Sequence, residues 1–98
     1  MKWRKKNVLE KQIEQYLNKK VKELNGLTFK WISTVTGVPD RIVIFNNKIH
    51  LVELKTATGV LSERQKLVFK QLEEHGQKVH IIRSKSDVEN FINEATAP

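Results

Sequence analysis

Two acids and a lysine stand where a hairpin would bring them together. Asp40 precedes the apolar segment 41–45, while Glu53 and Lys55 close the alternating segment 48–55. The intervening Asn46-Asn47 suits a two-residue turn, because asparagine tolerates the left-handed conformation. That turn places Asp40 opposite Glu53. Since side chains alternate along a strand, Lys55 lies on the same face as Glu53.

This arrangement predicts metal-assisted hydrolysis of a phosphodiester. Directly opposed Cβ atoms lie about 4.5 to 5.5 Å apart, where two carboxylates repel each other. A divalent cation between Asp40 and Glu53 converts that repulsion into coordination, and oxygen ligands suit Mg²⁺ or Mn²⁺. Lys55 can orient a water molecule or offset transition-state charge. The alternative is an ordinary surface salt bridge, which the apolar neighbours of both acids disfavour.

Glu10 and Glu14 are candidates for completing the site. They lie in segment 7–24, whose apolar residues recur at helical spacing. At 100° per residue, Glu10 projects about 55° from the centre of the apolar face and Glu14 about 95°. Glu10 is therefore the better inward candidate. The alternative is that both acids pair with neighbouring lysines along the helix.

Length and charge narrow the class of protein. The 98 residues form one domain, 1–98, because two cores would each have too little apolar surface. A net charge of +7, from 18 basic and 11 acidic residues, favours nucleic acid as the partner. The absence of cysteine excludes disulfides and thiolate metal sites. No apolar run is long enough to span a membrane and no signal peptide is recognisable, so we expect no membrane partner and a cytoplasmic location.

The predicted elements follow the order α-β-β-β-α-β-α. A basic arm, 2–6, precedes a helix over 7–24, and strands follow over 27–33, 41–45 and 48–55. A second helix runs from Ser62, where Ser62 and Gln65 form a capping-box pattern, to about His75. A strand over 78–83 precedes a helix capped by Ser86. This order predicts an α/β domain with one sheet covered by helices.

Gly37-Val38-Pro39-Asp40, Glu53-Leu54-Lys55 and the Leu61-Ser62 to Gln65 segment together resemble the VRR-Nuc (virus-type replication-repair nuclease) branch of the PD-(D/E)XK nuclease superfamily. The likeness covers nearly the whole chain. It implies a restriction-endonuclease-like fold with a central mixed sheet.

The resemblance also implies roles for individual residues. Asp40, Glu53 and the backbone carbonyl of Leu54 are expected to coordinate Mg²⁺ or Mn²⁺, with Lys55 assisting the water. Glu10 is expected to approach the site and Gln65 to belong to it; whether Gln65 acts there or only caps its helix stays open.

The expected activity is a metal-dependent DNA endonuclease selective for branched or junction-like DNA, acting as a homodimer. Basic residues of the arm and first helix are candidate phosphate contacts, with a solvated helix face as the alternative. They are Lys5, Lys6, Lys11, Lys19, Lys20 and Lys22. The competing function is a non-catalytic basic DNA-binding module on the same fold. Both functions require salt-sensitive binding to DNA.

Overall fold

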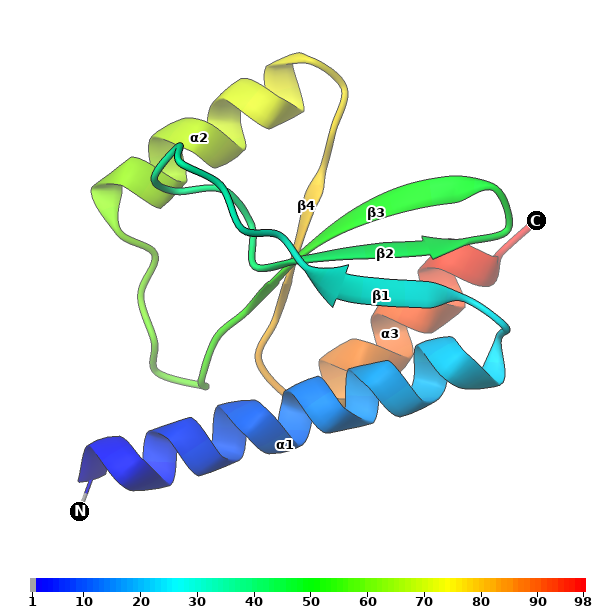
Figure 1. Cartoon of the computed structure of the whole chain (residues 1–98), viewed down its shortest axis with the longest axis horizontal. Coiled ribbons are helices and arrows are strands. Elements are labelled where there is room, and N and C mark those ends of the chain that lie inside the picture. The colour runs from blue at the N-terminus through cyan, green and yellow to red at the C-terminus, as the bar shows by residue number, and fades with distance from the viewer. Residues whose placement is uncertain (1) are drawn as a thin grey trace.

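The computed structural model describes the backbone of residues 2–98 and the side chains of residues 9–98. Helices and strands follow one another in the order expected from the sequence (Figure 1). They are α1 (Lys2–Glu23), β1 (Leu27–Lys30), β2 (Arg41–Phe45), β3 (Lys48–Leu54), α2 (Glu63–Glu74), β4 (Val79–Ile82) and α3 (Lys85–Thr96). No helix among the described residues is long and apolar enough to cross a membrane.

The four strands form one mixed sheet in the order β1-β2-β3-β4. The first three strands are antiparallel, and β4 runs parallel to β3. The hairpin register is the predicted one, with Phe45 opposite Lys48 and Arg41 opposite Val52. Asn46 and Asn47 make the turn with φ of 53° and 62°, the left-handed values that a type I′ turn requires. The predicted mixed sheet is therefore confirmed, together with the register that aligns Asp40 with Glu53.

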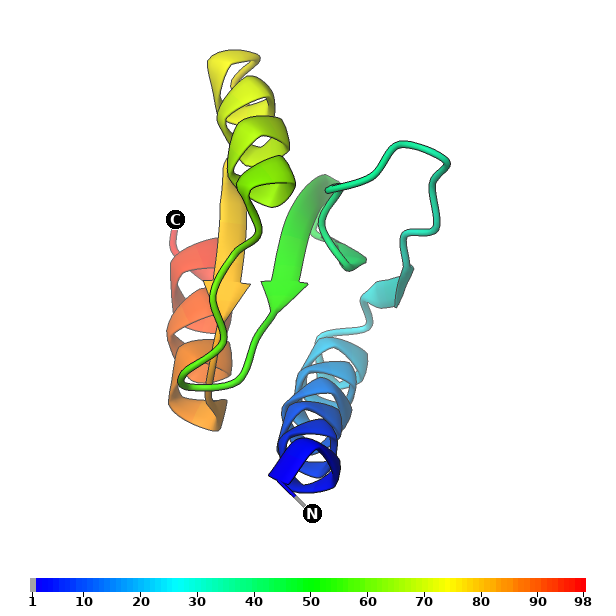
Figure 2. The same cartoon turned by 90° about the vertical axis from the view of Figure 1, so that its left-hand side faces the viewer.

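The main core lies between one face of the sheet and the pair α1 and α3, which lie together below the sheet in Figure 1, whereas Figure 2 shows α2 at the opposite end of the view from α1. Apolar side chains of the two helices meet alternate residues of the strands, as the sheet's period of two requires. The buried cluster comprises Ile13, Leu17, Val21, Val43, Phe45, Val52, Leu54, Ile82, Val88 and Phe91. Glu53 alternates with Val52 and Leu54, so it faces the other side, where α2 lies.

α2 covers only part of this second face. Its buried residues are Val68 and Phe69. On the portion formed by β1 and the hairpin, Leu27, Phe29 and Ile49 remain 64%, 48% and 63% exposed. The pairing of Leu27 and Ile49 with the two sides of Ile44 shows that these apolar residues share the face opposite α1.

Three predicted boundaries were wrong. The basic arm belongs to α1, which begins at Lys2, because segment 2–6 contains good helix formers and no glycine or proline. β1 ends at Lys30 rather than at residue 33, and the chain leaves the sheet after Trp31. The cap of α3 is Ser84, whose side chain accepts a hydrogen bond from the Asp87 N–H, so the helix begins earlier than the Ser86 pattern indicated.

Candidate active site

The carboxylates of Asp40 and Glu53 are each held by a backbone N–H of the opposite strand segment at the end of the hairpin. The Asp40 N–H donates to Glu53 Oε1 at 3.1 Å, and the Leu54 N–H donates to Asp40 Oδ2 at 3.0 Å. Both bonds lie just beyond the last residue pair of the ladder, Arg41 with Val52, so they continue the link between the two strand segments through side chains. The side chains are fixed where the sequence predicted them, facing each other across two strands.

Glu53 is a buried acid with an unfavourable neighbour. Glu53 is 2% exposed to solvent. Burial, followed by the negative charge of Asp40, raises the pKa of Glu53 to about 7, and Lys55 opposes this shift. Lys55 Nζ lies 3.6 Å from Glu53 Oε2, with the lysine side chain 20% exposed. The predicted trio is therefore assembled, and its lysine approaches the buried acid rather than open solvent.

Gln65 both caps α2 and contacts Glu53. Its backbone N–H donates to Ser62 Oγ at 3.1 Å, and its side-chain Oε1 accepts from the Ser62 N–H at 2.9 Å. These two bonds form the predicted capping box of α2. The remaining amide group, Nε2, donates to Glu53 Oε2 at 3.0 Å. One side chain therefore caps α2 and fixes the orientation of Glu53.

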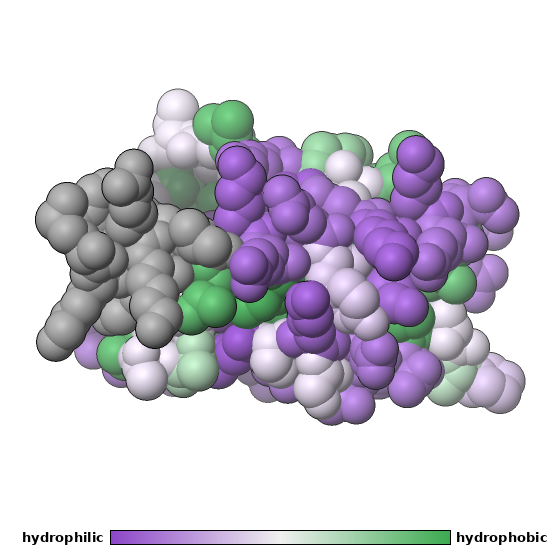
Figure 3. Space-filling view, turned by 90° about the horizontal axis from the view of Figure 1, so that it is seen from below, coloured by the Kyte–Doolittle hydropathy of each residue, from purple (hydrophilic) through white to green (hydrophobic). Residues whose placement is uncertain are grey.

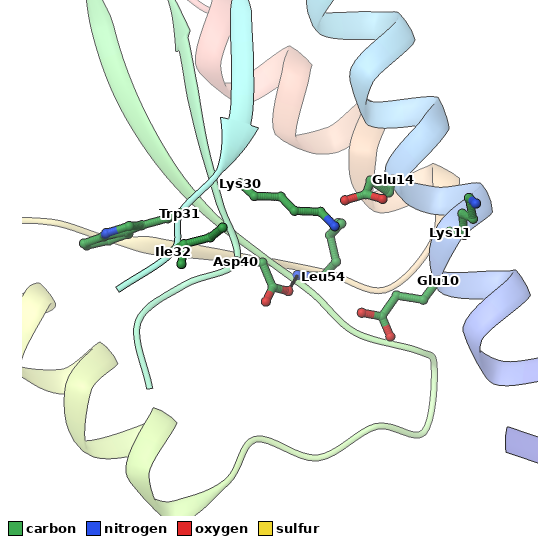
Figure 4. A pocket seen from close by; sticks show the side chains of 8 residues that line it. All are labelled: Glu10, Lys11, Glu14, Lys30, Trp31, Ile32, Asp40 and Leu54. Carbon is green, nitrogen blue, oxygen red and sulfur yellow. Dashed lines mark hydrogen bonds between the residues drawn. The ribbon is translucent and has the colours of Figure 1, made fainter. Parts of the chain in front are cut away.

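Glu10 comes to the same place from α1. It lines a cleft of about 460 Å³ together with Lys11, Glu14, Lys30, Trp31, Ile32, Asp40 and Leu54 (Figure 4). Burial and the charge of Asp40 raise the pKa of Glu10, while Lys55 lowers it. These electrostatic effects link Glu10 to two members of the trio. The structure thus places Glu10 near the site, as its projection on the helix predicted.

Glu14 has a different partner from the neighbouring lysines that the sequence offered. Its Oε2 accepts a hydrogen bond from Arg41 Nη1 at 2.8 Å, and Arg41 Nε also contacts Thr28 Oγ1 at 3.3 Å. Arg41 is 5% exposed, in the residue position next to Asp40. Sequence reasoning missed this bridge because a charged residue at the start of a strand gives no sign of which face it occupies. An odd-even count from the apolar Val43 would have placed Arg41 toward α1.

The loop that follows Lys55 is tied to the sheet by Arg83. Arg83 Nη1 donates to the Thr56 carbonyl at 2.8 Å and also to the Gly59 carbonyl. The backbone N–H of Lys55 donates to the Ile82 carbonyl at 3.0 Å, which extends the parallel pairing by one residue. The end of β4 and Arg83 therefore fix the backbone of Lys55 and of the loop that follows it. The sequence carried no signal for the Arg83 contact beyond a basic residue at a strand end.

The candidate phosphate contacts differ in their surroundings. Lys11 lines the cleft, and Lys19 and Lys22 are exposed. Lys20 is paired with Glu23 at 3.6 Å, which leaves it less suited to a phosphate. The side chains of Lys5 and Lys6 lie outside the described residues. Figure 3 looks onto the face that α1 crosses and shows hydrophilic residues over much of it.

The donor atoms at this site fit a hard divalent cation. Asp40 and Glu53 bring two carboxylates together, and burial leaves their repulsion poorly screened. Leu54 also lines the cleft, between Glu53 and Lys55. Among residues 9–98 no three histidine, aspartate or glutamate side chains are close enough to hold a metal. The remaining ligands would be a carbonyl, water and substrate oxygens, as Mg²⁺ prefers.

This α/β fold, with an acid pair and a lysine at the end of a hairpin, defines a nuclease-type domain. Residues 1–86 match the model of the VRR-NUC domain family, and the chain belongs to that family. A solved structure described as a VRR_NUC domain is similar over 86% of this chain and 94% of its own, with a TM-score of 0.79 and 24% identity. No curated protein matches the chain. The family membership predicted from the sequence is confirmed.

Proposed function

We propose that this chain is a metal-dependent DNA endonuclease. The observation that carries the proposal is the pair of carboxylates Asp40 and Glu53, of which Glu53 is buried, each fixed by a backbone N–H beside Lys55. A protein spends stability to hold two acids together out of water, so such pairs occur preferentially at functional sites. Asp40 also lines an open cleft of about 460 Å³, through which a sugar-phosphate chain would reach the pair.

Each residue has a distinct role in this proposal. Asp40, Glu53 and the carbonyl of Leu54 would hold Mg²⁺ or Mn²⁺, which supplies positive charge to the phosphate when bound. Lys55 Nζ orients the attacking water and offsets charge that develops on the phosphate oxygens. Glu10 accepts a hydrogen bond from a water molecule on the opposite side of the cleft. Gln65 holds Glu53 Oε2 in place, so the Glu53 side chain needs little rearrangement when the metal binds.

The substrate we propose is branched or junction-like DNA, bound by a homodimer. The chain's charge of +7 supports binding to a polyanion. The uncovered part of the sheet, with Leu27, Phe29 and Ile49 exposed, supplies an apolar surface that a second copy would cover. Two copies would present two sites to the arms of a branched molecule. A single domain of this size has little surface on which to hold two arms.

The test is cleavage of labelled four-way-junction, flap and duplex DNA with Mg²⁺, with Mn²⁺ and with chelator. We expect the wild type to cut only with metal, and Asp40→Asn and Lys55→Met to lose at least 100-fold in rate, as residues that act on developing charge do. Lys66→Met is the matched control, because Lys66 is exposed on α2. If wild type and variants bind DNA alike and none cuts, the chain is a non-catalytic DNA-binding module.

A further inference from the structure

One wall of the cleft is apolar and has no part in the proposed chemistry. Trp31 and Ile32 follow directly after β1 and line the cleft with Lys30. Ile32 is 88% exposed. In Figure 4, Trp31 and Ile32 lie on the opposite side of Asp40 from Glu10 and Lys11. Adjacent large apolar side chains at the mouth of a polar cleft indicate a binding surface more strongly than scattered ones do.

Trp31 is fixed relative to the acid pair. Its backbone N–H donates to the Asp40 carbonyl at 2.7 Å, which continues the pairing of β1 with β2 by one residue. The aromatic pairs found among residues 9–98 do not include Trp31. The backbone of Trp31 is therefore fixed beside Asp40, and its indole lines the cleft without a protein ring stacked upon it.

The charges around this wall suit a nucleotide. Lys30 and Lys11 both line the cleft, and Glu14, which also lines it, is already paired with Arg41. Cations beside an aromatic ring form the combination that proteins use to bind single-stranded nucleic acid, where lysines contact phosphates and rings stack on bases. Stacking needs an exposed base face, which the interior of a regular duplex does not offer.

We propose that Trp31, assisted by Ile32, stacks against an unpaired base next to the phosphate on which Asp40 and Glu53 act. The preferred substrate is then DNA with an unstacked nucleotide at the cleavage position, such as a flap or a single strand. This inference rests on the proposed nuclease function for its placement of the phosphate. The contact between Trp31 and the base is nevertheless measurable without cleavage.

The first test measures that contact in the full chain with chelator present. Trp3→Phe leaves Trp31 as the sole tryptophan, so its emission reports on the cleft. A single-stranded twelve-nucleotide DNA should quench the emission on binding, whereas a blunt duplex of the same sequence at equal occupancy should quench it much less. Equal quenching by both, or none by the single strand, would overturn the inference, whatever the outcome of the cleavage assay.

The second test compares cleavage of flap DNA with cleavage of blunt duplex. Trp31→Ala should lower the preference for the flap by roughly 5- to 150-fold, as loss of one stacked base does. Trp31→Phe should retain much of it. Ile32→Ser should lower it less and carries little folding risk, because Ile32 is so exposed. Leu67→Ser is the matched control, an exposed apolar residue of α2 outside the cleft.

The two proposals fail in different ways. A wild type that cuts neither DNA would remove the nuclease function and leave the quenching result to decide whether Trp31 binds bases. A wild type that cuts both, with a flap preference that Trp31→Ala and Ile32→Ser leave unchanged, would overturn the stacking inference alone.

Discussion

Arg41 Nη1 donates to Glu14 Oε2 at 2.8 Å, and this bond joins α1 to β2 one residue away from Asp40. The arginine side chain is 6% exposed and that of the glutamate 24%. Glu10 lies one turn before Glu14 on the same helix. The bridge therefore helps to fix the position of Glu10 relative to the acid pair. It also gives the buried positive charge of Arg41 a negative partner.

Removing Glu14 should therefore cost far more than removing a surface partner. Glu14→Ala leaves Arg41 buried without its counter-ion, and we expect a loss of about 3 kcal/mol in the free energy of unfolding. Urea denaturation measures it. Lys66→Ala, which breaks the exposed pair with Glu63, should cost under about 1 kcal/mol. Equal losses in the two variants would show that the Arg41 bridge contributes no more than a surface contact.

Because Gln65 both caps α2 and contacts Glu53, we expect loss of the α2 cap to lower stability and activity together, and loss of the α3 cap to lower stability alone. Ser62→Ala removes the acceptor of the Gln65 N–H and should cost about 1 kcal/mol of stability. It should also slow DNA cleavage severalfold, because losing this bond loosens the first turn of α2, from which the Gln65 side chain reaches Glu53. Ser84→Ala removes the corresponding cap of α3, with a similar stability loss. Thermal melts measure the stability of both variants, and DNA cleavage rates measure their activity. Equal cleavage rates in Ser62→Ala and Ser84→Ala would contradict the role of Gln65 in holding Glu53.

Stability should fall in acid because of two histidines. His50 stacks with Phe45 and contacts Phe91 and His80, and His80 also packs against Phe91. Burial lowers the pKa of both below 6.5, assisted by Lys48 for His50 and by Lys78 for His80, whereas Glu94 opposes the shift at His80. Below about pH 6.5, therefore, these two histidines bind more protons in the unfolded chain than in the folded chain. Their contribution to stability is complete above pH 6.5 and declines as pH falls below it.

The measurement compares wild type with the double variant His50→Gln/His80→Gln by urea denaturation from pH 7.5 to 5. Glu53 acts in the opposite sense, because its pKa is raised to about 7, and taking the difference between the two proteins removes that effect. We expect the wild type to lose more stability toward pH 5 than the double variant. His75→Gln is the control. Parallel pH curves would show that the aromatic cluster does not exclude the protonated rings.

The open face of the sheet predicts a change of assembly on charge insertion. Ile49 is 63% exposed on that face, so Ile49→Lys should leave the fold intact and shift the chain from dimer to monomer in light scattering. Val60→Lys, in the loop before α2 and 76% exposed, should not. A wild type that is monomeric at micromolar concentration would rule out the homodimer.

Local sequence signals sufficed for the parts of the site that depend on neighbours in the chain. The Asn46-Asn47 turn determined the hairpin register, and the spacing of Ser62 and Gln65 determined the cap of α2. Contacts between distant elements were not predictable in this way. The partner of Glu14 depended on which face of the sheet Arg41 occupies. The point at which the chain leaves the sheet, after Trp31, depended on where β2 begins.

The hairpin also makes the acid pair vulnerable from a distance. Asp40 and Glu53 lie at the open end of β2 and β3, while Asn46-Asn47 closes the other end. Because the side-chain period of a strand is two, one residue inserted in that turn would rotate the faces of β3 relative to β2. If Asn46-Asn47 still makes the turn, Val52 would then stand opposite Asp40, and Glu53 would face the apolar core. A change that touches no reacting group would thus dismantle the site, which makes the turn the most economical place to inactivate this domain.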